Sequence, residues 1–328
     1  MNLAVLGGGS WGTALAAQLC RARHPVRLWL RDAGVAEDIN QQHRNRAYLP
    51  GIELPAELSA TTDLAEAVAG VGTVFVVIPS EFCRGVYRQL RAHAGENAVI
   101  VSGTKGIEID TLRRMSEVAA EEVPGRSLAV LSGPSFALEV AREQPTTVVV
   151  ASADLMVAEA VQHLVSTRTF RAYSSDDVVG VELAGSLKNV IAIAAGIVDG
   201  IGYGHNTVAA LVTRGLAEIA RLAVAAGAGA DTLSGLAGLG DLVLTCTGTL
   251  SRNRRVGQAL GAGKSLAEAM AETRMVAEGV RTTLAACALA ERAGIEMPIA
   301  TQMREVLYRG RPPREAVEAL MLRTLKRE

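Results

Sequence analysis

The sequence is poor in cysteine, and its four cysteines stand far apart, at Cys20, Cys83, Cys246 and Cys287. None belongs to a CxxC pair, and none has the spacing to histidine that a metal site needs. This scarcity excludes a disulfide framework and a zinc module. We expect four reduced, buried thiols and no metal.

The sequence also has no large excess of positive or negative charge, since 33 basic and 34 acidic residues give a formal net charge of −1. No basic block marks a nucleic-acid surface, so we expect no nucleic-acid partner. A small anionic ligand would have to be held by local positive groups. Charged residues make up 20% and hydrophobic residues 49%, which is too apolar for disorder and sufficient for a large core.

Signals for export and membrane insertion are missing as well. The N-terminal stretch MNLAVLGGGSWGTALAAQL has no positively charged start, and glycines interrupt its apolar run. The most apolar later stretch, residues 183–198, carries Ser186, Lys188 and Asn189, which argues against a membrane span. We therefore expect a soluble, cytoplasmic protein without membrane insertion.

The first half of the chain contains six short apolar runs. Several are apolar throughout, as parallel strands buried on both faces are, and helical patterns at 13–23 and 111–122 lie between some of them. This order predicts an open, doubly wound α/β sheet. The predicted strands are Leu3–Leu6, Val26–Leu30, Val74–Ile78, Ala98–Val101, Leu128–Leu131 and Thr147–Val150.

From about residue 180 onward, Ala, Leu, Ile and Val recur at helical spacing with glycine-rich loops between, and no strand pattern is convincing. The boundary falls near Ser174–Gly180. We predict an α/β domain over residues 1–178 and an all-helical domain over residues 179–328. Helices are expected at 178–199, 207–227, 265–272, 279–293 and 298–308.

A glycine-rich motif joins the first predicted strand to the first predicted helix. Its sequence, Gly7-Gly8-Gly9-Ser10-Trp11-Gly12, fits G-x-G-x-x-G in the required strand-to-helix context. Gly7 allows the tight turn, Gly9 lets the backbone approach a pyrophosphate, and Gly12 lets the helix pack closely. A tight turn without a ligand is the alternative. The context predicts a Rossmann-type domain that binds NAD or NADP.

The end of the second predicted strand bears on which dinucleotide binds. An acid there would bind the ribose 2′-hydroxyl of NAD, whereas an arginine would pair with the 2′-phosphate of NADP. Leu30 occupies the acid's position, and Arg31 and Asp32 follow. This favours NADPH, with NADH tolerated.

A second glycine-rich stretch, residues 257–265, resembles a phosphate-binding P-loop. A true P-loop would need glycine where Gln258 stands and a strand just before it. We therefore assign no nucleotide to this stretch.

Candidate chemistry begins at the carboxyl ends of the predicted strands, beyond which ligands of open α/β sheets lie. Small residues dominate these ends, at 79–80, 102–106 and 132–137, and Lys105 is the single charge among them. It is either a site residue or a solvated loop lysine.

Lys188 is the only charged residue between Leu183 and Val198. Burial on such a helix would lower its pKa toward working pH, as a general acid/base for a carbonyl/alcohol pair requires. The alternative is a lysine that extends from a core helix to the surface.

A third cluster comprises Asp241 and the segment Ser251-Arg252-Asn253-Arg254-Arg255. Ser, Arg and Asn at a helix start offer a charge and donors to a phosphate, although a basic helix cap would have the same pattern. Asp241 is a rare acid in a long neutral stretch, and it could orient a lysine or bind a substrate hydroxyl.

Seven motifs follow one another along the chain: GGGSWGTALA, NRAYLPG, VSGTKGIE, SGPSFA, ELAGSLKNVIAIAAGIVDG, GLAGLGDLVLTCTGTLSRNR and VAEGV. Together they resemble the motifs of the bacterial NAD(P)-dependent sn-glycerol-3-phosphate dehydrogenases. The resemblance covers essentially the full length. It implies a helical catalytic domain, reduction of dihydroxyacetone phosphate to sn-glycerol 3-phosphate for phospholipid synthesis, and a homodimer.

The resemblance also implies roles for individual residues. Lys188 would exchange a proton with the substrate's C2 oxygen, and Lys105 would contact both substrate and cofactor. Further substrate residues would be Gly133, Ser135, Asp241, Ser251, Arg252 and Asn253. Beside Gly7, Gly9, Gly12, Lys105 and Arg252, the cofactor residues would be Ser10, Trp11, Arg31, Tyr48, Ala137, Val276 and Glu278.

Two other functions are compatible with the organisation. One is a different dehydrogenase of Rossmann-plus-helical plan, acting on a hydroxy acid or sugar acid. The other is a non-catalytic NAD(P) sensor, against which Lys188 and Asp241 argue, because a sensor needs no desolvated lysine.

Overall fold

The computed structural model describes residues 2–271, 277–325 and 327. This part of the chain divides into two compact units. The first runs to Glu108 and resumes over Arg113–Glu182, and the second comprises Leu183–Glu328 with the short segment Ile109–Leu112. The division after Glu182 lies four residues beyond the predicted end of the first domain, inside a continuous helix rather than in a linker.

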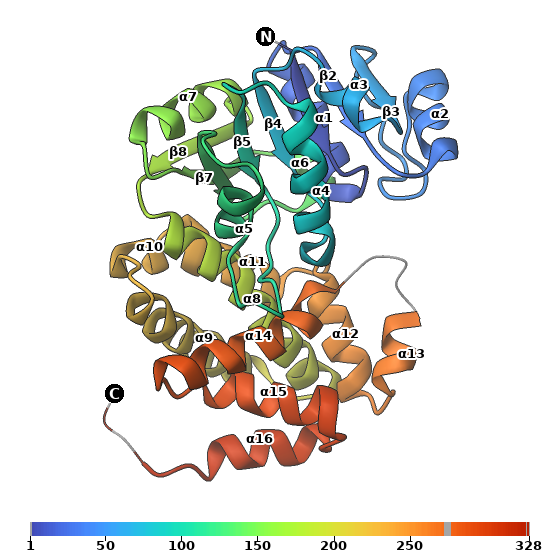
Figure 1. The fold of residues 1–328 in the computed structure, drawn as a ribbon. Coiled ribbons are helices and arrows are strands. Elements are labelled where there is room, and N and C mark those ends of the chain that lie inside the picture. The colour runs from blue at the N-terminus through green and yellow to red at the C-terminus, as the bar shows by residue number, and fades with distance from the viewer. Residues whose placement is uncertain (1, 272–276, 326, 328) are drawn as a thin grey trace. The chain divides into compact units, whose positions relative to one another are not determined.

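The first unit is built on one eight-stranded sheet in the order β3-β2-β1-β4-β5-β6-β7-β8 (Figure 1). All neighbouring strands are parallel except β6 and β7. The strand order reverses direction at β1, which pairs with β2 on one side and β4 on the other. The strands are β1 Leu3–Leu6, β2 Val26–Trp29, β3 Leu58–Thr61, β4 Thr73–Val76, β5 Val99–Ser102, β6 Leu128–Ser132, β7 Thr146–Ala151 and β8 Phe170–Ser175.

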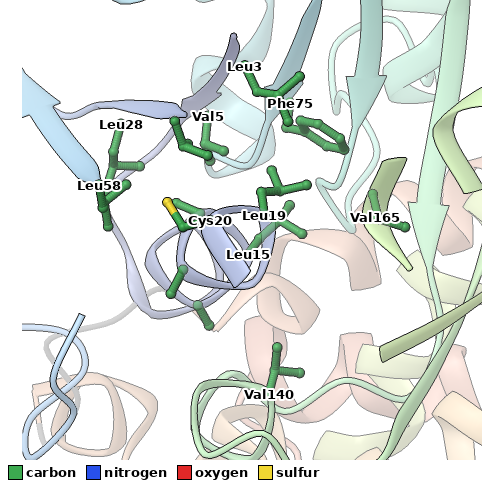
Figure 2. Packing of buried hydrophobic residues seen from close by; sticks show 14 of the residues in the cluster. Leu3, Val5, Leu15, Leu19, Cys20, Leu28, Leu58, Phe75, Val140 and Val165 are labelled. Carbon is green, nitrogen blue, oxygen red and sulfur yellow. The ribbon is translucent and has the colours of Figure 1, made fainter. Parts of the chain in front are cut away.

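Helices connect these strands and supply the apolar material for two separate cores. Leu3 and Val5 of β1 belong to one core, which Figure 2 shows around Leu15 and Leu19 of α1. Ala4 and Leu6 belong to the other. Both faces of β1 are thus buried, which explains its unbroken apolar run. The helices are α1 Ser10–Arg21, α2 Ala33–Gln42, α3 Leu64–Val68, α4 Ser80–His93, α5 Met115–Glu122, α6 Ala137–Ala141 and α7 Leu155–Val165.

The second unit contains helices and no strand in the part that the structure describes. The predicted fold class, a Rossmann-type sheet followed by an all-helical domain, is therefore confirmed. The helices are α8 Val178–Ile201, α9 His205–Ala225, α10 Ala230–Ser234, the π-helix η1 Leu236–Gly240, α11 Asp241–Thr247, α12 Arg252–Gly261, α13 Leu266–Ala271, α14 Glu278–Ala293, α15 Pro298–Arg309 and α16 Pro313–Met321.

Helix α8 is long and apolar enough to cross a membrane, but its most apolar window is entirely buried inside the protein. That is the pattern of a core helix in a soluble protein. The four cysteines are likewise buried, and all are free thiols, as predicted.

Helices α8 and α12 approach each other through glycines. A Cβ added at Gly196 would lie 1.9 Å from the carbonyl oxygen of Arg254, and one at Gly257 would lie 2.0 Å from that of Ile193. Gly200 and Gly261, one turn further along each helix, meet the opposite backbone in the same way. Gly257 and Gly261, two of the three glycines of the P-loop look-alike, thus serve close helix packing.

Two strands of the sheet were not predicted. β3 has the short sequence Leu-Ser-Ala-Thr and β8 the alternating sequence Phe-Arg-Ala-Tyr-Ser-Ser, and both lie at edges of the sheet. An edge strand keeps one open side, so it needs fewer apolar residues than a central strand and gives a weaker sequence signal. The first helix also begins at Ser10 rather than at residue 13, with Gly9 as its N-cap.

Candidate active site

The turn between β1 and α1 leaves space at one of its three motif glycines. A Cβ at Gly7 (φ +128°) would lie 2.2 Å from the Val77 carbonyl oxygen, and one at Gly12 would lie 1.8 Å from that of Gly7. Gly9, by contrast, has no heavy atom within 4 Å of such a Cβ. Two glycines therefore permit the tight turn, and the third leaves the N-terminus of α1 open to a ligand.

A buried asparagine outside the predicted set supports this turn. The Asn45 amide donates to the Gly8 carbonyl oxygen at 3.0 Å and to the Thr13 hydroxyl at 2.9 Å. Its oxygen accepts from the Tyr48 backbone N–H at 3.1 Å, and the Ser10 hydroxyl donates to the Tyr48 carbonyl oxygen at 2.5 Å. Two predicted cofactor residues, Ser10 and Tyr48, thereby meet. Asn45 stands in the NRAYLPG motif, but the motif alone gave no indication of its contacts.

The Trp11 side chain presents a buried polar atom beside this turn. Within the described chain its indole Nε1 has no hydrogen-bond partner. A Cβ at Gly103, at the end of β5, would lie 3.5 Å from that nitrogen. A buried donor of this kind calls for an acceptor. Together with the open helix N-terminus, it fits an NAD or NADP molecule, which is rich in acceptors.

The end of β2 carries Arg31, whose guanidinium lies 4.9 Å from the centre of the Phe82 ring. The Asp32 carboxylate accepts hydrogen bonds from the backbone N–H groups of Gly34 (2.9 Å) and Val35 (3.2 Å), so it caps α2. Leu30 is buried against Gly8. The strand end therefore presents a cation, while its acid stabilises a helix.

Three predicted substrate residues meet where β5 and β6 end. The Lys105 ammonium donates to the Gly133 carbonyl oxygen at 2.9 Å, and the Ser135 hydroxyl donates to the same oxygen at 3.0 Å. Gly133 adopts φ +130°, a conformation that favours glycine. Ala137 follows as the first residue of α6. Lys105 is thus held in place by the protein.

The second unit buries an ion pair between Lys188 of α8 and Asp241 of α11. The Lys188 ammonium lies 2.5 Å from an Asp241 carboxylate oxygen and donates to the Thr245 hydroxyl at 2.7 Å. The two residues are 6% and 1% exposed, so water contributes little to either side chain. Burial disfavours the ammonium form of Lys188, whereas the adjacent carboxylate favours it.

Two local features shape this ion pair. Asp241 directly follows the π-helix η1, a rare element that often marks functional sites. Thr245, one helical turn later, donates its hydroxyl hydrogen to the Asp241 carbonyl oxygen at 2.6 Å. Sequence reasoning missed Thr245. Its spacing of four residues from Asp241 was the available signal.

The start of α12 holds the third predicted cluster. The Ser251 hydroxyl caps this helix by accepting from the Arg254 N–H at 3.2 Å. Asn253 is buried, donates to the Asn189 side chain at 2.9 Å and accepts from the Gly279 N–H at 3.0 Å. It therefore ties α12 to α8 and α14.

Arg252, at the first position of α12, is one of the three arginines of this cluster. Burial lowers the pKa of its guanidinium, and the positive charge of Arg255 acts in the same direction. The negative charge of Glu278, the first residue of α14, opposes both effects. A desolvated guanidinium of this kind attracts an anion strongly. The remaining prediction, Val276, lies outside the described residues.

Comparisons with known proteins cover almost the whole chain. Residues 2–158 match the family model described as the NAD-dependent glycerol-3-phosphate dehydrogenase N-terminus, and residues 177–318 match the model for the C-terminus. The resemblance stated from the motifs is thus confirmed.

Individual relatives agree with the family models. A glycerol-3-phosphate dehydrogenase (NAD(P)+) of Geobacter sulfurreducens is 53% identical over 100% of this chain and 98% of its own length. One from Nitratidesulfovibrio vulgaris is 52% identical, with both chains fully covered. The crystal structure of a glycerol-3-phosphate dehydrogenase from Coxiella burnetii has a TM-score of 0.95 and 42% identity, covering 98% of this chain and 99% of the other.

Proposed function

The chain belongs to the NAD-dependent glycerol-3-phosphate dehydrogenase family, and from this premise we propose how its own residues carry out the reaction. The family interconverts dihydroxyacetone phosphate and sn-glycerol 3-phosphate with NAD(P)H. The protein is accordingly an oxidoreductase that uses NAD or NADP. We assign dinucleotide binding to the first domain and substrate binding to the second.

The observation that carries the mechanism is the buried ion pair of Lys188 with Asp241. When bound, the dinucleotide supplies or accepts a hydride. When the ketone carbon gains the hydride, the oxygen bonded to it becomes an alkoxide. Lys188 donates a proton to this oxygen. Asp241 and Thr245 hold the ammonium in position through both contacts at Nζ. Lys105 adds a positive charge that stabilises the developing oxyanion.

The substrate phosphate is remote from the reacting carbon, so its binding contributes positioning rather than chemistry. We assign this binding to Arg252, with Ser251 and Asn253 at the same helix start. Because both polar ends of the Asn253 amide already contact protein atoms, its main contribution is to fix α12. Gly133 and Ser135 line the substrate pocket beside Lys105.

The cofactor is held in this proposal by the open N-terminus of α1 and the residues around it. Gly7, Gly9 and Gly12 shape the turn, and Ser10, Trp11 and Tyr48 lie beside it. Further cofactor contacts are assigned to Arg31, Lys105, Ala137, Arg252, Val276 and Glu278.

A comparison of two substrates tests the proposed function. With NADPH, dihydroxyacetone phosphate should be reduced efficiently, and unphosphorylated dihydroxyacetone should be reduced poorly, because it lacks the group that Arg252 binds. We expect kcat/KM to differ by a factor on the order of 10² or more, since charge-assisted hydrogen bonds contribute about 1.5–3 kcal/mol each. Initial rates of NADPH oxidation measure this ratio. Equal rates would remove the phosphate-binding role from the start of α12.

Arg31→Ala tests the preference for NADPH. Arg31 is the cation at the end of β2, and Asp32 is engaged as a helix cap, so the loss of Arg31 should raise KM for NADPH more than KM for NADH. Steady-state kinetics with each cofactor at saturating dihydroxyacetone phosphate measures both constants. An unchanged ratio between the two KM values would reject this reading of the 2′-phosphate.

The cellular role follows from the product. We propose that the enzyme is cytoplasmic, acts as a homodimer and supplies glycerol 3-phosphate as the head-group precursor of phospholipids. The resemblance to the family supports this proposal, and so does the complete burial of the apolar part of α8 inside the protein.

A further inference from the structure

The loop that carries Lys105 joins β5 to α5 and extends over residues 103–114. At its start, the Thr104 hydroxyl donates to the Ile78 carbonyl oxygen at 2.8 Å. Further out, the loop doubles back, because the Glu108 N–H donates to the Arg113 carbonyl oxygen at 2.9 Å. Leu112, with φ +59°, lies in the return of the loop. Lys105 thus stands on the first arm of a narrow, two-armed loop.

Arg84 of α4 forms an ion pair with Glu108 on this first arm. Its guanidinium donates from Nε to one oxygen of Glu108 at 2.8 Å and from Nη2 to the other at 2.7 Å. This bidentate geometry fixes direction as well as distance. The side chains are 26% and 15% exposed, so water screens the pair only in part. Glu108 follows Lys105 by three residues.

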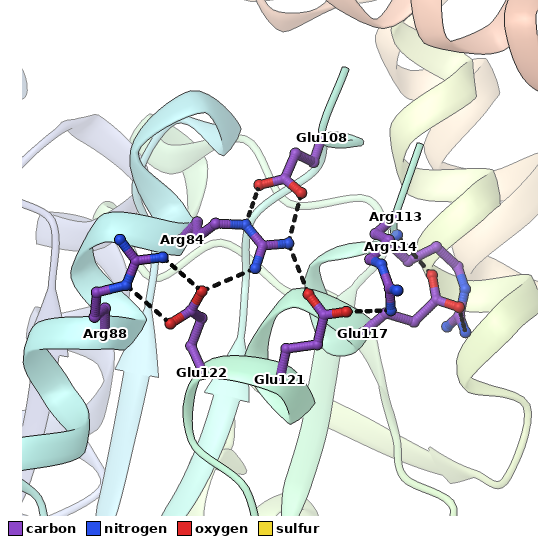
Figure 3. A network of polar contacts seen from close by, with 8 residues as sticks. All are labelled: Arg84, Arg88, Glu108, Arg113, Arg114, Glu117, Glu121 and Glu122. Atoms are coloured by element: carbon purple, nitrogen blue, oxygen red, sulfur yellow. Dashed lines mark hydrogen bonds and ion pairs between the residues drawn. The ribbon is translucent and has the colours of Figure 1, made fainter. Parts of the chain in front are cut away.

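The same guanidinium reaches α5 on its other side. It pairs with Glu121 and Glu122, at 2.8 Å in each case. Glu121 also pairs with Arg113, on the second arm of the loop (Figure 3). The hydrogen bonds to these three carboxylates raise the pKa of the Arg84 guanidinium above its ordinary value, and the bond to Glu108 has the largest effect. Arg84 therefore links α4 to α5 and to the first arm directly, and to the second arm only through Glu121 and Arg113.

The second arm has its own anchor. Arg114 pairs with Glu182 at 2.7 Å and with Glu117 at 3.2 Å, and the buried Glu182 carboxylate also accepts from the Ser116 backbone N–H at 2.8 Å. Without Arg84, the second arm would still be held to Glu182 and Glu117 by Arg114. Glu108 would lose its guanidinium partner, and the Glu121 and Glu122 carboxylates beside that position would repel it.

We propose that Arg84 is a positioning residue for the reaction, which holds the Lys105 ammonium in its working place by clamping Glu108. This inference rests on the role proposed above for Lys105. It adds a residue of α4 that touches neither the Gly133 carbonyl oxygen nor the Lys105 side chain in any described contact.

A pair of matched variants, Arg84→Gln and Arg88→Gln, tests the proposal. Each variant removes one arginine from α4. Arg84 and Arg88 both pair with Glu122, but in the described contacts Arg88 pairs with neither Glu108 nor Glu121. We expect Arg84→Gln to lower kcat/KM for dihydroxyacetone phosphate about tenfold, equivalent to about 1.4 kcal/mol. Arg88→Gln should stay within about twofold, since exposed pairs contribute little.

Glu108→Gln provides a second route to the same result. It keeps Arg84, removes the carboxylate that Arg84 clamps and should lower kcat/KM in the same direction. Thermal unfolding of all variants identifies any that fail to fold. If Arg84→Gln does not fold, Glu108→Gln alone decides: unchanged kinetics in that variant would overturn the proposal.

A double-mutant cycle with Lys105→Ala separates this inference from the function on which it rests. If Arg84 acts through Lys105, Arg84→Gln should change kcat/KM less than about threefold when Lys105 is already alanine. A full tenfold loss in that background would show that Arg84 acts elsewhere. If Lys105→Ala alone leaves kcat/KM unchanged, the proposed role of Lys105 fails, and the positioning role fails with it. If only the Lys105 variant is impaired, the positioning role alone fails.

Discussion

Replacement of Lys188 by alanine should lower kcat by a factor on the order of 10² or more, as expected when a general acid/base is lost. KM for NADPH should change little, because Lys188 belongs to the helical unit and none of its described contacts involves the glycine turn. Steady-state rates with dihydroxyacetone phosphate and NADPH measure both quantities. Lys264→Ala is the matched control, since it removes an exposed lysine of the same unit.

Removal of Lys188 also leaves Asp241 buried without its cation, and this alone costs roughly 3–5 kcal/mol of stability. Lys188→Met combined with Asp241→Asn avoids that cost, because both charges disappear together. We expect the double variant to unfold at a higher temperature than Lys188→Ala while its kcat stays just as low. Near-normal turnover in a folded variant without Lys188 would remove this lysine from the chemistry.

Gly257→Ala should be strongly destabilising, as one of the single-methyl changes in the helical unit that bring a new Cβ against a backbone atom. The new Cβ would lie 2.0 Å from the carbonyl oxygen of Ile193, a backbone atom that cannot move aside without shifting α8. Overpacking of this kind costs about 1–3 kcal/mol or more. Because α8 carries Lys188 and the start of α12 carries Arg252, the shift should also lower kcat/KM. Thermal unfolding and initial rates test the two effects.

Gly85→Ala is the matched control for this prediction. Gly85 lies inside α4, and a Cβ there would have no heavy atom within 4 Å. Alanine is favoured over glycine in a helix by about 1 kcal/mol, so this variant should be slightly more stable than the parent. Wild-type stability in Gly257→Ala would show that α8 and α12 tolerate a wider separation.

The central strands were predictable because burial on both faces demands runs of apolar residues, as Leu3–Leu6 shows. β3 and β8 were not, because edge strands such as Phe170–Ser175 are short and contain no unbroken apolar run. The short helices α10 and α11 and the π-helix between them were missed for another reason. Helices of five to seven residues are too short to display a period.

The candidate site was predictable where one charge interrupts an apolar or neutral stretch. Lys188 and Asp241 stood out in this way, and the structure brings them together across 53 residues of sequence. Asn45 and Thr245 did not stand out, because amides and hydroxyls are common in loops and helices. Their importance depends on which backbone carbonyl or ammonium lies opposite, and this is set by tertiary packing.

The capping role of Asp32 determines where cofactor preference could be rewritten by engineering. A change toward NADH would require a carboxylate facing the ribose hydroxyls. Asp32 cannot be redirected without uncapping α2, at a cost of about 1 kcal/mol. Position 30 is closed, because the Leu30 side chain fills the space beside Gly8. Position 31 is therefore the place to change the cofactor preference. The Arg31 side chain is exposed and lies over the Phe82 ring, so an acidic residue can replace it without disturbing the core.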